Sequence, residues 1–207
     1  MSDLANLQAP RDAVNMYAPD GPPGNRIRRA NMTLALRLAR ERGPDLLLIG
    51  EAPGYNGARR TGIPFTSERL LLDGLSPLGQ FGAGRGFALA TDDGRISSEQ
   101  TATIVYRELS RLELFAAGWN AYPLHPHQPA NDQSNRTPRP AETVLGRPFL
   151  IRFLDLFPNA PVVAMGNVAA TALTALGVPY TKLRHPAQGG ARIFAAGLNH
   201  FAATLRR

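Results

Sequence analysis

The hydrophobic positions of this 207-residue chain follow two patterns, and each predicts one kind of element. Continuous apolar runs at residues 45–51, 114–122 and 161–166 lack polar alternation, which is typical of parallel strands buried on both faces. Apolar residues at helical spacing predict an amphipathic helix over 25–43, which stops at a Gly-Pro pair. Further helices are expected at about 10–17, 66–80, 98–112, 141–156, 167–176 and 191–204, and shorter strands at 86–90 and 180–183.

Strands that alternate with helices predict an α/β fold, in which a parallel or mostly parallel sheet is covered on both faces. Residues 1–23 are rich in Pro, Gly and Asp and are expected to form a loose arm before a single domain at 24–207. Ligands of such folds bind outside the carboxyl ends of the strands. Three unusual segments are expected at those ends, at 50–65, 120–128 and 184–190.

Composition narrows the chemistry. The chain has no cysteine, which excludes disulfides, iron–sulfur clusters and thiolate zinc sites, and its four histidines lack metal-ligand spacing. We therefore expect no metal and no cofactor. No run approaches the roughly 18 apolar residues of a membrane helix, and the N-terminus lacks a signal peptide, so we expect a cytoplasmic protein that does not bind membranes. The net charge of +7 is compatible with binding a polyanion such as DNA.

The segment GEAPGYNGARRTGIPF follows the first apolar strand and holds two candidates for chemistry. Glu51 ends that strand, where a buried carboxylate is costly unless it is paired or faces a solvated cleft. Phe65 follows a Gly-Ile-Pro turn and is expected at the wall of the same cleft. The alternative is a tight turn that Glu51 caps, with Phe65 in the core.

Two later strands end in polar residues. The carboxamide of Asn120 offers one donor and one acceptor to a planar amide-like edge, such as that of uracil. His185 lies in the turn RHPAQGG, where it could donate a hydrogen bond to negative charge developing on a leaving group. Each has a structural alternative: Asn120 as a turn residue bonded to its own backbone, and His185 as a structural histidine beside a functional Arg184.

Histidines and arginines gather in the loops beside the expected cleft. His125 and His127, in PLHPHQP, suggest a metal site, but loop structure or contact with the DNA backbone is the favoured interpretation. The arginines are candidates for phosphate contacts, although exposed loop arginines are common. They are Arg59, Arg60, Arg136 and Arg139.

Taken in order, these motifs resemble the uracil-DNA glycosylase superfamily. The resemblance rests on GEAPG with a downstream GIPF, a strand ending in N-A-Y-P, and an H-P turn followed by glycines, from about Asp45 to Phe201. The first motif is most similar to the iron–sulfur family of bacteria and archaea. The resemblance implies a three-layer α/β/α sandwich with a central, mostly parallel four-stranded sheet. It also implies a monofunctional enzyme of base excision repair that flips uracil out of DNA, hydrolyses its N-glycosidic bond and leaves an abasic site.

The resemblance further implies roles for individual residues. Glu51 would orient the attacking water or stabilise the sugar cation, and His185 would hydrogen-bond the uracil O2 as the base leaves. Phe65 would stack on the flipped uracil, and Asn120 would read its edge. The other expected substrate contacts are Gly50, Ala52, Pro53, Gly54 and Tyr55. The expected DNA contacts are Arg59, Arg60, Arg184, Gln188 and Arg192, with Gln188 or Arg192 as the wedge that enters the duplex.

Two departures from the family pattern leave the specificity open. The cluster cysteines are absent, and Gly54 stands where the best-known members carry the tyrosine that rejects thymine. Mismatched thymine, hypoxanthine and xanthine therefore remain candidate substrates. The expected partner is uracil-containing DNA, single- or double-stranded, bound by a monomer at the nucleoid of a bacterium.

Three rival interpretations remain. The first is a non-catalytic module that binds uracil-containing DNA, and the second is a glycosylase that becomes trapped covalently on its product. The third is a small-molecule hydrolase, against which the absence of a G-x-S-x-G motif argues.

Overall fold

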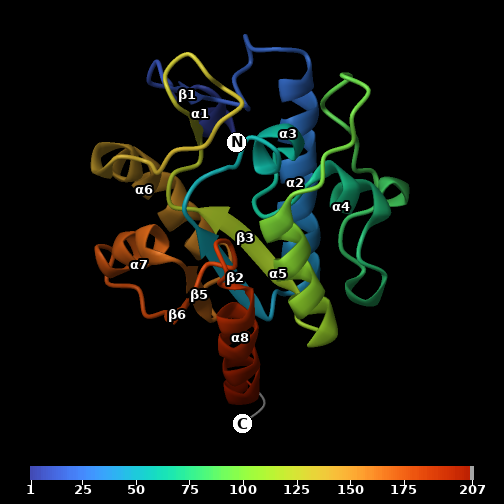
Figure 1. The fold of residues 1–207 in the computed structure, drawn as a ribbon, viewed down its shortest axis with the longest axis vertical. Coiled ribbons are helices and arrows are strands. Elements are labelled where there is room, and N and C mark those ends of the chain that lie inside the picture. The colour runs from blue at the N-terminus through green and yellow to red at the C-terminus, as the bar shows by residue number, and fades with distance from the viewer. Residues whose placement is uncertain (206–207) are drawn as a thin grey trace.

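A four-stranded parallel sheet forms the centre of the computed structural model, which describes residues 1–205 (Figure 1). Its strands are β2 (Leu46–Gly50), β3 (Ala116–Asn120), β5 (Val162–Met165) and β6 (Thr181–Leu183), in the spatial order β3-β2-β5-β6. The chain leaves β2 for β3 on one side and then crosses to β5 on the other. Such a reversal makes β2 a topological switch point, and the carboxyl ends of the strands beside it form a crevice.

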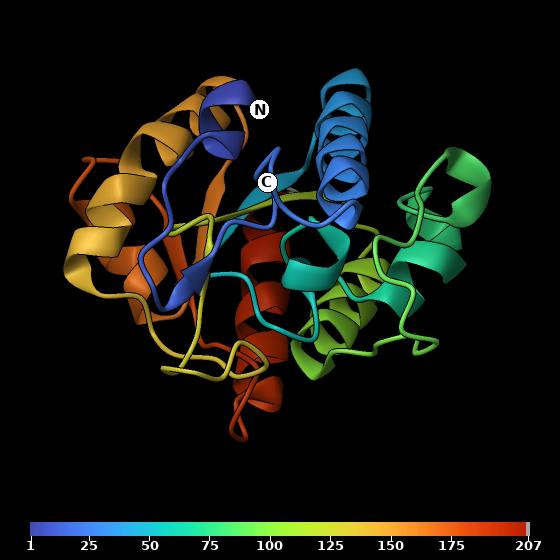
Figure 2. The same cartoon turned by 90° about the horizontal axis from the view of Figure 1, so that it is seen from above.

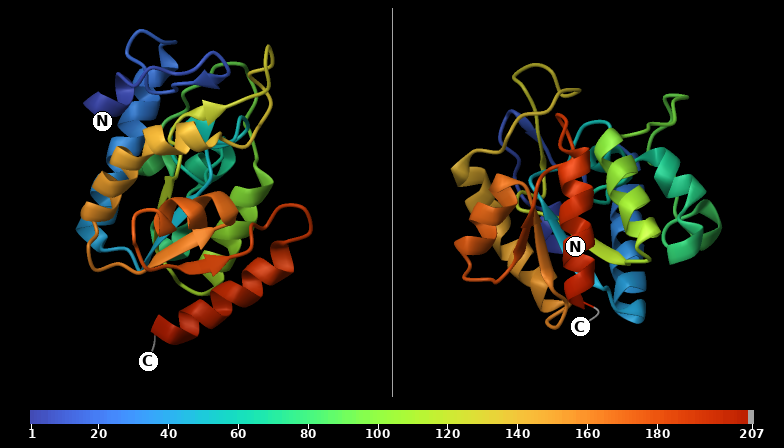
Figure 3. Two further views of the ribbon diagram at one scale, coloured as in Figure 1. Left: turned by 90° about the vertical axis from the view of Figure 1, so that its left-hand side faces the viewer. Right: turned by 60° about the horizontal axis from the view of Figure 1, so that its bottom comes forward.

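Helices cover both faces of the sheet, which confirms the predicted three-layer α/β/α architecture. Figure 2 shows α2 (Gly24–Arg42) and α6 (Pro140–Asp155) on one side of the sheet, and α5 (Gln100–Arg111) and α8 (Ala191–Leu205) on the other. The helices α5 and α8 lie side by side (Figure 3). The first layer also includes α7 (Asn167–Thr174), and the second includes α4 (Glu68–Asp73).

Alternation along β2 divides the core between these layers. Leu47 and Ile49 pack into the cluster of α2, α6 and α7, whereas Leu46 and Leu48 pack into the cluster of α4, α5 and α8. Side chains of successive strand residues point to opposite faces, so a strand buried on both sides needs apolar residues at every position. Each such side chain contributes about 1.5–3 kcal/mol on full burial. The unbroken apolar run at 45–51 therefore predicted this strand correctly.

The N-terminal segment differs from its prediction. Residues 10–17 form no helix; they contain β1 (Ala13–Val14), which pairs with β4 (His125–Pro126), while α1 (Ser2–Ala5) lies nearer the terminus. Met16 and Tyr17 are buried in the core. The carboxamide of Asn15 donates hydrogen bonds to the backbone carbonyls of Leu4, Ala5 and Leu7. Residues 1–23 are thus packed against the domain and are not a loose arm.

The strand expected at 86–90 is also absent. The carboxamide of Asn31, on α2, both accepts from the backbone N–H of Ala88 at 3.1 Å and donates to its carbonyl at 2.9 Å. One side chain therefore satisfies the backbone groups that a neighbouring strand would otherwise pair.

The helix expected at 66–80 is shorter than predicted. It ends at Asp73 because Gly74 adopts a positive φ of 70°, and two 3-10 helices follow, at Ser76–Leu78 and Ala83–Arg85. The loop before it contains an unpredicted short helix, α3 (Ala58–Thr61). Within residues 1–205, no helix combines the length and apolar character needed to cross a bilayer.

Candidate active site

A cleft with a volume of about 1210 Å³ lies at the carboxyl edge of the sheet. Each strand contributes to its lining: Glu51 follows β2, Asn120 ends β3, Met165 ends β5 and His185 follows β6. Phe65 completes the group. All three segments that were expected at the strand ends therefore meet in one cleft.

Backbone hydrogen bonds hold Glu51 at the carboxyl end of β2, beside the end of β3. The pairing of β2 with β3 continues beyond the strands, because the N–H of Ala121 donates to the carbonyl of Gly50 at 2.9 Å and that of Tyr122 to Glu51 at 3.0 Å. Burial raises the pKa of the Glu51 carboxyl, and the side chain of Thr137, which lines the same cleft, opposes the rise. A carboxylate with a raised pKa is suited to take a proton near neutral pH.

Two glycines make room for the ring of Phe65. A Cβ on Gly50 would lie 2.6 Å from Phe65 Cζ and 2.7 Å from Asn120 Oδ1, and a Cβ on Gly118 would lie 2.9 Å from Phe65 Cδ2. The ring thus lies directly on the backbone of β2 and β3, beside the Asn120 side chain. Phe65 also has a positive φ of 59°, a conformation that costs about 1–2 kcal/mol for a residue with a side chain. Strain of this kind concentrates at functional sites.

The carboxamide of Asn120 is buried and faces the cleft. The residue is only 4% exposed, and no hydrogen bond joins its side chain to any other residue among 1–205. Buried polar groups in native proteins are nearly always paired, and one that is unpaired at a cleft is available to a ligand. The turn alternative for Asn120 finds no support in this geometry.

The surroundings of His185 favour the neutral form of its imidazole. Burial lowers its pKa, with a smaller upward contribution from Glu99 and a downward one from Arg184. Its Nδ1 accepts the backbone N–H of Ala187 at 3.2 Å, which leaves the proton on Nε2. A Cβ on Gly190 would lie 2.0 Å from the His185 carbonyl oxygen, so only glycine fits where the loop turns back.

The irregular segment 123–139 braces the first motif. The ring of His125 lies 2.7 Å from the Pro53 carbonyl through Nδ1, and Asn135 Oδ1 accepts the N–H of Tyr55 at 2.9 Å. Arg59 forms an ion pair with Asp132 in the same segment. Both ring nitrogens of His125 thus contact backbone carbonyls, those of Pro53 and Asp132. Within residues 1–205, no group of three His, Asp or Glu side chains is arranged to hold a metal ion.

Comparison with known proteins decides the family. The family model described as the uracil DNA glycosylase superfamily matches residues 39–206. This chain belongs to that superfamily. It is a DNA glycosylase, a hydrolase that acts in DNA repair and binds DNA as its substrate.

A solved structure agrees in fold. The crystal structure of wild-type SMUG2 from Pedobacter heparinus is similar to this glycosylase with a TM-score of 0.63 at 13% sequence identity. The similarity covers 99% of this chain and 94% of that chain. Comparison with curated protein sequences gives no match.

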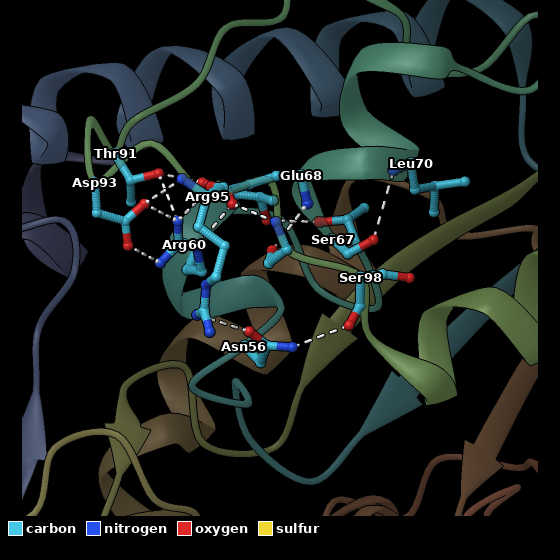
Figure 4. A network of polar contacts seen from close by, with 12 residues as sticks. Asn56, Arg60, Ser67, Glu68, Leu70, Thr91, Asp93, Arg95 and Ser98 are labelled. Atoms are coloured by element: carbon cyan, nitrogen blue, oxygen red, sulfur yellow. Dashed lines mark hydrogen bonds and ion pairs between the residues drawn. The ribbon is translucent and has the colours of Figure 1, made fainter.

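One expected DNA contact of the glycosylase has a structural role instead. The guanidinium of Arg60 is 10% exposed and forms ion pairs with Glu68 at 2.7 Å and Asp93 at 2.8 Å (Figure 4). It also donates to Thr91 Oγ1 and to the Arg95 carbonyl. These bonds use the donors that a phosphate would need, so Arg60 is not available to DNA. Sequence reasoning missed this because the acidic partners are brought in by folding.

The other basic residues near the cleft differ in whether they are ion-paired or exposed to solvent. Arg136 is nearly buried in ion pairs with Glu142 and Asp12, whereas Arg184 is exposed beside the cleft. Arg192 is exposed in the first turn of α8. Polar cleft-lining residues that the sequence did not single out as candidates include Glu99, Thr101, Asn135, Thr137, Asn167 and Lys182.

Proposed function

We propose that this glycosylase excises uracil from DNA, and that Glu51, Phe65, Asn120 and His185 carry the reaction. The observation that supports the proposal is the buried, unpaired carboxamide of Asn120 beside the Phe65 ring, in a cleft that Glu51 and His185 share. A flipped pyrimidine would stack on the ring and pair its edge with the amide.

Two groups face the charges that develop during hydrolysis. When the bond between C1′ and N1 breaks, its electrons go to uracil, and the sugar becomes cationic. The Nε2–H of His185 would donate to the uracil O2, and the Glu51 carboxylate would stabilise the sugar cation and take a proton from the water that adds to C1′. Interactions that strengthen only in the transition state raise the rate of the chemical step.

The carboxamide of Asn120 accounts for selection against cytosine. Uracil offers an N3–H donor beside the O4 acceptor, and an amide matches both. Cytosine presents the reversed pattern and would leave a buried amide mispaired, which can cost several orders of magnitude in rate. Extrusion of the base costs a few kcal/mol, least from a mismatch or a single strand.

Phosphate contacts and a wedge complete the proposed interface. Arg184 and Gln188 lie at the mouth of the cleft, and Gln188 stands exposed on the 184–190 loop with a positive φ of 52°. We assign Gln188 as the residue that fills the gap left by the base, because Arg192 lies within α8, beyond that turn.

The test is incubation of a labelled oligonucleotide that contains one uracil, followed by alkaline cleavage of abasic sites, with Glu51→Gln and Asn120→Ala in parallel. We expect strand cleavage at uracil by the wild type and a loss of about 100-fold or more in both variants. Salt-sensitive binding without any abasic product would instead identify a non-catalytic module.

A second candidate function is excision of larger or methylated bases. A Cβ on Gly54 would meet nothing closer than Asn135, at 3.8 Å, so the position that rejects thymine in better-known members is open here. The same assay with mismatched thymine, hypoxanthine and xanthine measures this range. Activity confined to uracil would show that another group excludes them.

A further inference from the structure

A carboxamide from the bracing segment (residues 123–139) lies beside Gly54 in the cleft. Asn135 lines the same cleft as Glu51 and Asn120. A Cβ on Gly54 would lie 3.8 Å from Asn135 Oδ1 and 3.9 Å from its Nδ2. Both are ordinary van der Waals distances, so the Asn135 carboxamide forms the wall of the cleft next to the backbone of Gly54.

One end of this carboxamide is fixed and the other is free. The backbone N–H of Tyr55 donates to Asn135 Oδ1 at 2.9 Å, which identifies that atom as the oxygen. The Nδ2 group carries two N–H donors, and no hydrogen bond joins it to another residue among 1–205. Because Asn135 is exposed at the cleft, these donors are accessible to a bound ligand.

The neighbouring residues hold the backbone of Asn135 on both sides. The hydroxyl of Ser134 accepts the backbone N–H of Gln128 at 2.9 Å, and the backbone N–H of Arg136 donates to the carbonyl of Pro126 at 3.3 Å. Together with the contact at Oδ1, these bonds set the direction of the Nδ2 donors before a ligand binds. A donor that is placed in advance loses less conformational entropy on binding.

The order of the strands places Asn135 and His185 on opposite sides of the cleft. His185 follows β6, at one edge of the sheet, whereas the bracing segment follows β3, at the other edge. In uracil, C5 lies opposite C2 across the ring, and C2 carries the O2 atom that His185 would face. A base held by the proposed contacts would therefore turn its C5 edge toward Asn135.

We propose that Asn135 is a specificity-determining residue, whose Nδ2 donates a hydrogen bond to an acceptor attached to C5 of the base. Deaminated purines carry such an acceptor, because their N7 is bonded to C5, whereas thymine carries a methyl group there. A methyl group against Nδ2 would bury the donor without pairing it. This inference rests on the proposed function and adds deaminated purines such as hypoxanthine to its substrates, in preference to mismatched thymine.

The experiment measures single-turnover excision of uracil, hypoxanthine and mismatched thymine from otherwise identical oligonucleotides. Asn135→Asp keeps the shape of the side chain and an oxygen for the N–H of Tyr55, but replaces the Nδ2 donors with an acceptor. We expect it to lower the rate on hypoxanthine relative to uracil about 10-fold or more, because two acceptors would then face each other. Asn135→Ala removes the donor altogether and should raise the rate on thymine relative to uracil about 10-fold.

These ratios stay constant when a variant binds all DNA less tightly, since each substrate is then affected alike. Asn159→Ala, in the exposed turn before β5, is the matched control and should leave both ratios unchanged. Ratios in both Asn135 variants that equal those of the wild type would overturn the inference and leave the proposed function standing. So would a wild type that excises uracil but not hypoxanthine. No excision of uracil by the wild type would sink the proposed function, and the inference with it.

Discussion

At the scale of single residues, the cleft contains groups that are unfavourable to the folded state. Glu51 is partly buried without a cationic partner, Asn120 is buried without a hydrogen bond, and Phe65 has a positive φ. Each arrangement costs stability, and each is offset by the packing around it. Such residues mark where a sequence favours function over stability.

The carboxyl of Glu51 should therefore link stability to pH. Its pKa is raised on folding, so ionisation above that pKa destabilises the folded state, whereas below the unfolded value of about 4.3 the group is neutral in both states. We expect Glu51→Gln to raise Tm at pH 7 to 8 and to have no effect on Tm near pH 4, while removing activity at every pH. Calorimetry across this range is the measurement. An equal change in Tm at pH 4 and pH 8 would show that the carboxyl does not ionise differently in the two states.

The packing of the Phe65 ring against Gly118 gives a second prediction at this scale. In Gly118→Ala, the new methyl would lie 2.9 Å from the ring, which must move by several tenths of an ångström to relieve the contact. We expect the rate of uracil excision to fall about 10- to 100-fold, because small displacements of substrate-positioning groups have effects of this size. Gly84→Ala, where a Cβ meets nothing within 4 Å, is the matched control. Equal excision rates for both variants would contradict the inference that Gly118 positions the Phe65 ring.

At the scale of elements, buried ion pairs join segments that the hydrophobic core does not. Arg60 on α3 is paired with Glu68 on α4 and with Asp93 in the following loop (Figure 4). Burial raises the pKa of Glu68, but hydrogen bonds from Arg60, Thr91 and Ser97 outweigh it, and the net pKa is lowered. The network therefore depends on Arg60.

We expect Arg60→Met to lower the free energy of unfolding by about 3–5 kcal/mol, because Glu68 would remain buried without its partner. Asp93→Asn should cost much less, since its side chain is 50% exposed. Urea denaturation of both variants at neutral pH measures the difference. Similar losses in the two would mean that the network acts through Asp93 rather than through the buried pair.

Elements were predictable from the sequence where the local pattern determined them. The runs at 45–51, 114–122 and 161–166 became strands because burial on both faces requires apolar residues at every position. The segments at 10–17 and 86–90 were predicted wrongly because distant groups satisfy their backbones. β1 pairs with β4, more than a hundred residues later, and Asn31 supplies both hydrogen bonds to Ala88.

The candidate site follows the same division. The meeting of Glu51, Asn120 and His185 in one cleft could be predicted because strand ends of a parallel sheet lie at one edge. Thr137 and Asn135 were missed because an irregular segment has no periodicity that reveals which way its side chains turn. Arg60 was assigned to DNA because charge alone does not distinguish a free guanidinium from a paired one.

At the scale of the whole molecule, the net charge of +7 should make DNA binding sensitive to salt. Each phosphate contact contributes about −0.9 to the slope of log K against log salt. We expect Arg184→Ala and Lys182→Ala, made in a Glu51→Gln background, each to reduce the magnitude of this slope by about 1. Fluorescence anisotropy with a uracil-containing oligonucleotide measures it.

Arg40→Ala is the matched control for the slope. Arg40 is exposed near the end of α2, which leads into the amino end of β2, at the edge of the sheet away from the cleft. Its removal lowers the net charge equally but should leave the slope almost unchanged. A slope that falls by the same amount in all three variants would indicate diffuse attraction and not contacts at the cleft mouth.

The attachments of the first motif have an evolutionary consequence. The bracing segment bonds to the carbonyl of Pro53 and the N–H of Tyr55, which are backbone groups that almost every residue type possesses. Mutations that change the side chain at position 55 therefore leave the bracing contacts intact. Tyr55 is not among the residues that line the cleft, so such mutations alter the surface beside the site and spare the backbone contacts of the first motif. A library randomised at Tyr55 should accordingly yield mostly folded members.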